Sequence, residues 1–493
     1  MLRPMLMKSF SSFRGRCVRH LGTAVLCVVL LGSSQASFAA SAGRQDAVAR
    51  QPVYSGQRSA ETADRPVAGK SIGMSDAVEH ALRFNPGLGA QEAESRSSEE
   101  GRKSARGAFG PRLGVSYSAT KTESKRDPSA TMGTKNPKMG VYSWGIEVTQ
   151  PIFQGFRLLS TYQKAALQAD SDKASLRKAE LDMTEQVQTA FLEYLKAGEN
   201  TRSMRDSLTR LREQLRIAQA YFEVGLSPRL DVLQAEVDVS EAERLLIEAE
   251  NTQATTLARL NTLLGFDATA VNTYTGTLKE VGFRYTLEQC LELAYRQRPD
   301  LYVAQKAVEI ARKSQKEVQS DYYPQIEGYY SMTQSGNTPG MQRSGENGSQ
   351  VTNWEVGAQA TWNVFEWGTT YYADKQAGWQ VTKMRYEQEN LKLEVGYDIK
   401  SKHLAVQEAR KRIAVAQNSV AQATEAYNVA LARYHEHVGT NFDVLDASAN
   451  LTSAQSSLTG AKADYLTALS QIYVAMGEYH PDLLREGGAA RRK

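Results

Sequence analysis

The sequence predicts a mostly α-helical fold with a β-barrel part, built from two copies of one structural unit. The two copies are evident because residues 222–243 align without gaps to residues 434–455, at an offset of 212 residues. Each copy contains two segments with apolar residues at every second position, which predict strands, and longer segments with apolar residues three and four apart, which predict helices. This helical spacing is typical of coiled coils. We therefore expect an internal pseudo-dimer.

The two ends of the chain are predicted to lie outside this duplicated fold. Residues 1–39 combine a basic start, an apolar run and a small-residue cleavage site, which is typical of a secretory signal peptide. A membrane anchor is the alternative, but the apolar run is too short to span a bilayer. Its removal takes away five positive charges, so the formal net charge falls from +4 to −1 (4 − 5) and gives no support for a nucleic-acid partner. Residues 40–70 predict a flexible leader and residues 481–493 a C-terminal tail.

The same series of elements is expected in the first repeat, residues 71–268, and in the second, residues 286–480. Each repeat opens with two shorter helices that end before a proline, because the residue preceding proline disfavours helix. Residues 269–285 are predicted to be a linker that joins the repeats. The ranges predicted for strand, strand, long helix and returning helix are 112–124, 139–152, 157–223 and 229–264, and then 324–334, 351–364, 369–435 and 441–477.

The predicted strands have one apolar and one polar face. In a membrane barrel the apolar face contacts lipid, and aromatic residues gather near the strand ends. A soluble four-stranded sheet covered on one face is the alternative. Four strands cannot close a barrel, and an open sheet edge cannot lie in lipid, so a membrane barrel needs several copies; three copies supply twelve strands. The predicted membrane-facing residues are Tyr142, Trp144, Trp354, Val356 and Trp362.

The long helices predict a cylinder that continues such a barrel. A helix over residues 157–223 has 67 residues, or about 100 Å at 1.5 Å per residue. The shorter helices of about 22 and 36 residues nearly match this length when placed end to end. Residues of the seam near the end of the long helix are Met204, Leu208, Leu211, Leu215, Ala218 and Phe222, and the second copy repeats this register.

The ordered series of elements and the two turns, VGLSPRLDVL at 224–233 and VGTNFDVLD at 438–446, resemble the TolC-like outer-membrane efflux protein family. The resemblance covers about residues 71–480. It implies a homotrimer of the Gram-negative outer membrane that extends into the periplasm: a 12-stranded transmembrane β-barrel, a trimeric α-barrel tunnel of coiled-coil helices, and an equatorial belt that includes the equatorial linker 269–285. It also implies an exit duct that receives its cargo from an inner-membrane transporter, ABC or proton-driven, through a periplasmic adaptor. Efflux of small molecules and type I protein secretion both fit.

The resemblance places a periplasmic constriction at Asp231, Tyr434, Asp443 and Asp446. Asn441 stands where the family often has an arginine, and the second turn has a shorter Gly-to-Asp spacing, so we expect a less tightly closed resting gate. Asp443 and Asp446 are three residues apart, on one helix face. Three copies would gather six carboxylates, which favours cations. The alternative is that Asp443 is a helix N-cap and Asp446 is merely solvated.

The turns themselves are implied to be the tips that meet the adaptor. The glycines in them have a simpler alternative function, which is to end a helix. Both functions are compatible. The predicted docking residues are Val224, Gly225, Leu226 and Ser227 in the first turn, and Val438, Gly439 and Thr440 in the second.

The sequence contains no P-loop, Gly-x-Ser-x-Gly or Cys-x-x-Cys motif, so we expect neither enzyme activity nor a cofactor. His435 and His437 do not share a helix face, so we expect no metal site there. After signal removal Cys290 is the remaining cysteine, which excludes an intramolecular disulfide. A periplasmic coiled-coil protein without a pore is the alternative to the exit duct.

Overall fold

The structure of the protein is a computed structural model that describes residues 71–123, 138–339 and 350–484. The predicted signal peptide and leader lie outside the described residues, as do residues 485–493 of the tail. Of the described helices, none is both long and apolar enough to cross a lipid bilayer.

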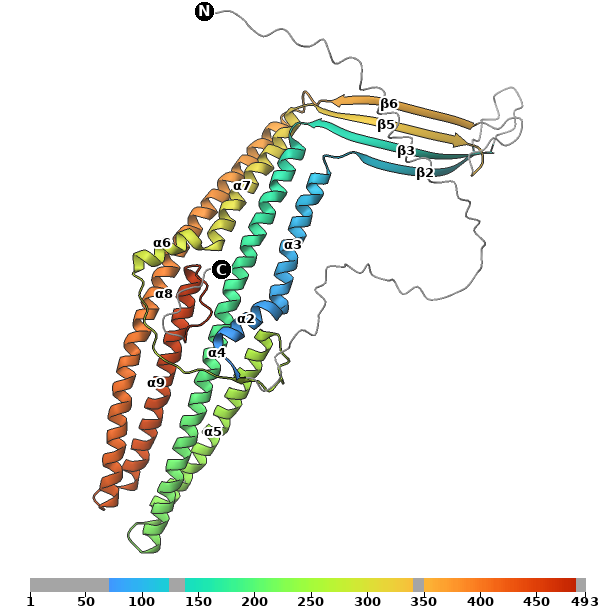
Figure 1. The fold of residues 1–493 in the computed structure, drawn as a ribbon. Coiled ribbons are helices and arrows are strands. Elements are labelled where there is room, and N and C mark those ends of the chain that lie inside the picture. Colours follow the sequence, from blue (N-terminus) through green and yellow to red (C-terminus); the bar gives the residue numbers. More distant parts are fainter. Residues whose placement is uncertain (1–70, 124–137, 340–349, 485–493) are drawn as a thin grey trace, which may run out of the picture. The chain divides into compact units, whose positions relative to one another are not determined.

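The described elements repeat in order along the chain (Figure 1). The second half reproduces the first with a shift of 212 or 213 residues between the starts of equivalent helices and longer strands. Elements of the first half are β1 (Ser71–Ile72), α2 (Met74–Phe84), α3 (Pro86–Gly107), β2 (Arg112–Glu123), β3 (Lys138–Gln154), α4 (Arg157–Glu223) and α5 (Arg229–Leu264). Those of the second half are β4 (Thr273–Tyr274), α6 (Leu287–Gln297), α7 (Pro299–Gln319), a 3₁₀ turn (Ser320–Tyr322), β5 (Gln325–Gly336), β6 (Gln350–Thr361), α8 (Thr369–His435) and α9 (Asn441–Ala475).

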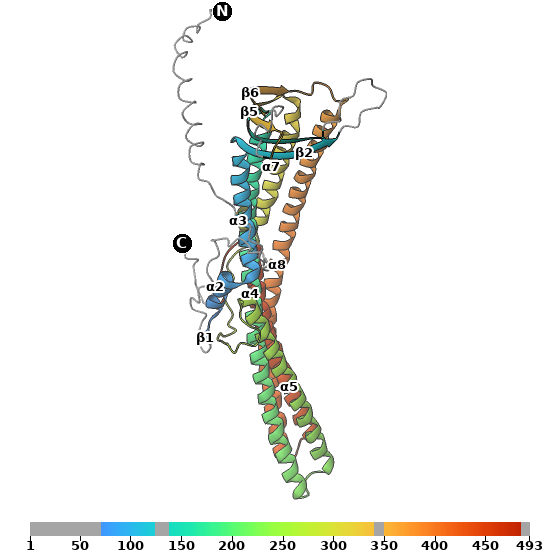
Figure 2. The ribbon, with the colours of Figure 1, turned by 90° about the vertical axis from the view of Figure 1, so that its right-hand side faces the viewer.

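Each long helix packs against two shorter helices placed one after the other. Helix α4 contacts α3 along one part of its length and α5 along the rest, and α8 contacts α7 and α9 in the same way (Figures 1 and 2). Near the sheet, contacts run from α3 to α4, from α4 to α7 and from α7 to α8. Towards the other end, α4 contacts α9. The helices near the sheet therefore form a row with α3 and α8 at its two ends.

Asn85 joins α3 to α5 end to end. Its side-chain oxygen caps α3 by accepting from the N–H groups of Gly87 and Leu88, at 2.8 and 3.2 Å. Its Nδ2 donates to the carbonyl of Leu263 in the last turn of α5, at 2.8 Å. Helix termini leave N–H groups at their start and carbonyl groups at their end without partners inside the helix. The Asn85 amide supplies partners both to the start of α3 and to the end of α5.

Glycine makes these junctions possible. Gly265 ends α5 in the left-handed region (φ 81°), and a Cβ there would lie 2.8 Å from the carbonyl oxygen of Phe84. Gly477 follows α9 with φ 78°, and its Cβ would lie 2.9 Å from the backbone of Gln297. Only a residue without a Cβ allows both the conformation and the close approach.

An equatorial belt surrounds the junctions and contains the main hydrophobic core. Helices α2 and α6 bury one face each against α4 and α8, and the segment after β4 packs over α9. There the ring of Phe283 contacts the ring of Tyr473 with centroids 6.0 Å apart, and Tyr465 donates a hydrogen bond to the carbonyl of Val281. Cys290 is fully buried in this core. The belt thus fixes the middle of both long helices.

The four-stranded sheet is antiparallel, in the order β2-β3-β5-β6. Its register aligns side chains of one kind across all four strands. The row on the apolar face is Val115, Ile146, Met332 and Trp354, and the adjacent row on the polar face is Gly114, Glu147, Ser331 and Glu355. Strands β2 and β6 each have one edge without a partner strand among the described residues.

Four of the predicted membrane-facing residues lie on this apolar face. Trp354 and Val356 are exposed on β6, while Tyr142 and Trp144 are partly covered on β3. Trp362 does not belong to the strand. Strand β6 ends at Thr361 rather than at residue 364, and the indole N–H of Trp362 donates to the carbonyl of Tyr322. The prediction that Trp362 is a strand residue was wrong because period-two alternation continues past the last strand pairing.

Gly265→Ala or Gly477→Ala is expected to destabilise the protein by about 1–3 kcal/mol, because the new Cβ meets backbone atoms and the left-handed conformation is unfavourable. Thermal unfolding of the detergent-solubilised protein measures the effect. Gly282→Ala is the matched control, since nothing lies within 4 Å of a Cβ there. Equal melting temperatures for all three variants would show that the junctions tolerate a side chain.

Candidate functional site

The candidate site is the pair of turns farthest from the sheet, where α4 meets α5 and α8 meets α9. Both turns have the same length, because α4 ends at Glu223 and α5 begins at Arg229, while α8 and α9 follow the same spacing. In the first turn Gly225 adopts the left-handed conformation (φ 75°). In the second turn His437 adopts it (φ 58°), two residues before Gly439. The shorter Gly-to-Asp spacing therefore does not mean a shorter turn.

The two turns close with equivalent hydrogen bonds. The N–H of Leu226 donates to the carbonyl of Tyr221 at 2.8 Å, and the N–H of Val438 donates to the carbonyl of Arg433 at 2.9 Å. Such bonds satisfy the last carbonyls of a helix. His437 also places its ring 5.0 Å from that of Tyr221, which joins the second turn to the first hairpin.

Gly439 is needed for space rather than for a positive φ. Its N–H donates to the carbonyl of Arg433 at 3.0 Å, and a Cβ would lie 3.1 Å from the Cβ of Arg433. Gly225 has no atom within 4 Å of a Cβ and is needed for its conformation. Glycine is thus required at these two tip positions for different physical reasons.

The tips expose apolar side chains at equivalent positions. Leu226 is 61% exposed and Val438, 212 residues later, is 70% exposed. Val224 and Phe442 are also exposed. Exposed apolar side chains that gather at the end of a molecule indicate an interaction surface.

Thr440 and Asp443 form a capping box at the start of α9. The N–H of Asp443 donates to the Thr440 hydroxyl at 3.2 Å, and the Asp443 carboxylate accepts from the Thr440 N–H at 2.9 Å. The hydrogen bond from the Thr440 backbone lowers the pKa of Asp443, and the bond from its hydroxyl adds to this. Thr440 is therefore the N-cap, and the alternative that Asp443 is the N-cap was wrong in position.

Asp443 and Asp446 line two different hollows beside α9. Asp443 lines a hollow between α8 and α9, beside Arg433 and Glu425. Asp446 lines a hollow between α5 and α9, beside Asp238, and accepts a hydrogen bond from Asn450 at 3.0 Å. A spacing of three residues did not bring the two carboxylates into one hollow.

Asn441 is the residue that sequence reasoning undervalued. It is fully buried, its Nδ2 donates to the backbone carbonyl of Asp231 at 3.0 Å, and its Oδ1 accepts from Gln214 at 2.7 Å. One amide thus joins α9 to both α4 and α5. The sequence contains no pattern for it, because an asparagine after a threonine cap is ordinary in a helix start.

Asp231 takes part in this link through its backbone carbonyl, and its charge acts on Tyr434. Burial raises the pKa of Tyr434 to about 12, and the negative charge of Asp231 adds to this. Burial also raises the pKa of Asp231. The Tyr434 ring packs against Tyr221, with centroids 5.5 Å apart. Of the four predicted constriction residues, these two interact electrostatically.

Further along, the seam between α4 and α9 stays polar. The Thr452 hydroxyl interacts with Ser207 at 3.0 Å and accepts from the Arg210 guanidinium at 2.9 Å. The guanidinium lies 6.0 Å from the ring centre of Tyr427 on α8. Buried hydrogen bonds specify one geometry but bury little apolar area. Within the described part of the chain, no group of three or more His, Cys, Asp or Glu side chains could hold a metal ion.

A duplicated helical hairpin unit that carries a four-stranded sheet with one apolar face is the architecture of outer-membrane channels. The family model described as "Outer membrane efflux protein" matches residues 77–266 and 290–478. The chain belongs to this family. The predictions of the family, of the fold class and of an exit duct in the outer membrane that extends into the periplasm are confirmed.

Named relatives are similar over most of their length. The alkaline protease secretion protein AprF of Pseudomonas aeruginosa is 25% identical over 415 residues, 82% of this chain and 84% of AprF. Outer membrane protein TolC of Vibrio cholerae is 24% identical, over 82% of this chain and 90% of TolC. The fold is similar to the Campylobacter jejuni CmeC outer membrane channel, with a TM-score of 0.71 at 17% identity, over 82% of this chain and 85% of CmeC.

Thr440→Ala is expected to fray the start of α9 and to cost about 1 kcal/mol, because it removes the cap. Hydrogen exchange at residues 441–445, corrected for intrinsic rate, measures this. Thr440→Ser keeps the hydroxyl and is the control. In the wild type, the lowered pKa of Asp443 means that protection is present above its unfolded-state pKa and is lost as pH falls through its folded-state pKa. Unchanged protection in Thr440→Ala would show that the capping box does not hold the turn.

Proposed function

We propose that the protein works as a homotrimeric exit duct, which receives cargo from a periplasmic adaptor and an inner-membrane transporter, either ABC or proton-driven. The observation that carries the proposal is that the helix row and the sheet are both open at both ends: α3 and α8 in the row, β2 and β6 in the sheet. Three copies close both into rings, and the sheet becomes a twelve-stranded barrel without edges.

The apolar face of the sheet supports contact with outer-membrane lipid through Tyr142, Trp144, Trp354 and Val356. A periplasmic coiled-coil protein without a pore would leave this face in water, which is unfavourable. The cargo belongs to one of two classes, polypeptides or small toxic molecules. AprF is named for secretion of a protease and BepC of Brucella suis for efflux, so the relatives support both classes.

The adaptor binds the two turns in this proposal. Leu226 and Val438 occupy equivalent positions, so a trimer presents six similar apolar tips. A repeated adaptor can contact all six with the same surface, and the hollow between α5 and α9, which includes Leu233 and Phe442, offers an adjacent site for an apolar side chain.

The double variant Leu226→Asp with Val438→Asp is expected to lower export at least tenfold, because charged side chains cannot enter an apolar docking surface. Export of a polypeptide and of a small toxic compound is measured in cells, together with trimers in outer-membrane fractions. Glu223→Gln with Glu436→Gln is the control, since it changes charge at the same level and leaves the apolar tips. Normal export by the aspartate variant would remove the tips from the mechanism.

The periplasmic mouth is held closed, in this proposal, by the buried link of Asn441 with Gln214 and Asp231. An opening movement that separates α9 from α4 and α5 must break two hydrogen bonds. Asp446 and Asp238, which line one hollow, supply negative charge at the mouth, and Asp443 lines the hollow between α8 and α9.

Asn441→Leu is expected to raise the open-to-closed ratio. Loss of a buried amide link costs the closed state about 1–3 kcal/mol, which corresponds to roughly 5–150-fold. Planar-bilayer recordings of purified trimers measure this, and Asn418→Leu, which replaces an exposed amide on α8, is the control. In the same recordings Asp446→Asn with Asp238→Asn should weaken cation selectivity. Wild-type conductance in Asn441→Leu trimers would exclude the link as the closing contact.

A further inference from the structure

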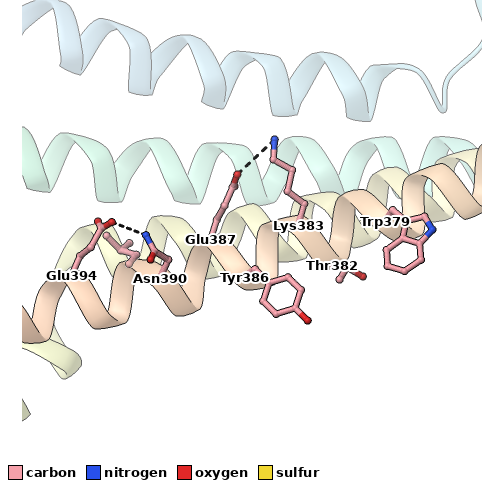
Figure 3. A pocket seen from close by; sticks show the side chains of 8 residues that line it. Trp379, Thr382, Lys383, Tyr386, Glu387, Asn390 and Glu394 are labelled. Atoms are coloured by element: carbon pink, nitrogen blue, oxygen red, sulfur yellow. Dashed lines mark hydrogen bonds and ion pairs between the residues drawn. The ribbon is translucent and has the colours of Figure 1, made fainter.

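A face of α8 near the sheet exposes large apolar side chains at heptad spacing. Trp379, Tyr386 and Leu393 are seven residues apart and are 72, 69 and 74% exposed. Figure 3 shows the rings of Trp379 and Tyr386 pointing away from the neighbouring helices. Residues at this spacing line one side of a helix and form a coiled-coil seam. In the single chain, nothing among the described residues covers them.

A second set of residues on the α8 seam alternates with these three large side chains, and this second set is polar. The spacing of the full set alternates between three and four residues, which is the pattern of positions a and d in a heptad. All its members are exposed. They are Gln376, Trp379, Lys383, Tyr386, Asn390 and Leu393.

Helix α3, at the other end of the helix row, has a matching seam of small residues. Its exposed positions also alternate by three and four residues. Five of the six side chains are Ala, Ser or Gly, so they leave room for large side chains. The seam consists of Ala90, Ala93, Ser97, Glu100, Ser104 and Gly107.

Contacts across the row fix which residues of α3 and α8 lie at the same level. Paired residue numbers have a nearly constant sum between antiparallel helices. Ser98 bonds to Asp172, Thr161 to Glu317, and both Gln315 and Gln319 to Asp374. The sums are 270 (98 + 172), 478 (161 + 317), and 689 to 693 (315 + 374 and 319 + 374).

Carried across the row, these sums place Ser97 level with residue 173 of α4, with residue 305 of α7, and with residues 384–388 of α8. Tyr386 is the middle of that range. The exposed aromatic residue and the exposed small residue therefore occur at one height on the two free ends of the row.

We propose that α8 of one copy packs against α3 of a second copy, antiparallel, with Tyr386 opposite Ser97. In this register Trp379 faces Ser104 and Leu393 faces Ala90, so each large side chain meets a small one. Lys383 faces Glu100, and these two side chains have opposite charges. The proposal rests on the homotrimer proposed above and names the surface and register that close it.

The same register is distinguished from its neighbours by charge. A shift by one heptad places Lys383 opposite Ala93 or Gly107 and leaves Glu100 opposite an amide. The single chain holds these charges only by exposed local ion pairs, Lys383 with Glu387 at 3.6 Å and Lys103 with Glu100 at 2.7 Å. Such exposed pairs are weak, so exchange of partners on assembly is easy.

Cysteine pairs in the full-length protein test the register. Ser97→Cys with Tyr386→Cys, oxidised by oxygen with a copper catalyst, is expected to give a covalent trimer on a non-reducing gel that a thiol reductant reverses. Ala90→Cys with Tyr386→Cys is the matched control; one heptad displaces the two sites by about 10 Å, beyond disulfide reach. Native Cys290 does not interfere, because burial raises the pKa of its thiol to about 11.

A size exchange tests the same contact without cysteines. Ser97→Phe alone is expected to lower the trimeric fraction at least tenfold in native mass measurements, and Tyr386→Ser in the same chain is expected to restore it. Tyr386→Ser without the first change should leave trimers that dissociate more easily. Failure of the second change to restore assembly would contradict the pairing of these two positions.

The outcomes separate this proposal from the exit duct. If wild-type trimers form and conduct but cross-linking occurs in the Ala90 control instead, the register is overturned and the exit duct stands. If neither pair cross-links in stable trimers, the α8 face belongs to another occupant such as the adaptor, and the proposal is overturned. If the wild-type protein is a monomer, both proposals fail.

Discussion

The architecture depends on the end-to-end contact of two shorter helices along one long helix. Without it, α4 and α8 would each have half of an apolar face without a partner. The contact requires two helix ends to meet without unsatisfied backbone groups, and Asn85 meets this requirement at the first junction. It also requires the absence of a Cβ, which Gly265 and Gly477 supply. The hydrophobic belt then forms around these junctions, because α2 and α6 arrive there.

The distribution of apolar burial along the long helices follows from that arrangement. The belt contains the large buried cluster, with Phe191, Tyr465 and Ile399, whereas the smaller cluster towards the turns contains Leu208, Val239 and Ala242. Between α4 and α9 the seam near the turns is held by hydrogen bonds instead. When helices separate, a hydrogen bond between them is replaced by hydrogen bonds to water at a modest net cost in free energy. Separation of a packed apolar core has no such replacement. Movement of the turns can therefore occur without loss of the belt.

The open ends of the helix row and of the sheet are the second consequence. If one chain covered the edges of its own helix row and sheet, several copies could not join into a ring around a lumen. Edges that stay open can instead pair with another copy. Large side chains on α8 and small ones on α3 are complementary only between copies, since the row separates them within one chain. Closure of the helices and closure of the strands are coupled, because α3 leads into β2 and β6 leads into α8.

The sequence by itself determined the repeat, the ranges of the long helices, the strand faces and the family, since all of these depend on periodicity within one segment. The tertiary structure decided which residues of different helices lie against each other. It gave the left-handed position of the second turn to His437 rather than Gly439, put Asp443 and Asp446 in different hollows beside α9, and buried Asn441 against Gln214. Spacing fixes an angle around one helix axis, but the side that becomes buried depends on where the neighbouring helices pack, and that is a property of the whole fold.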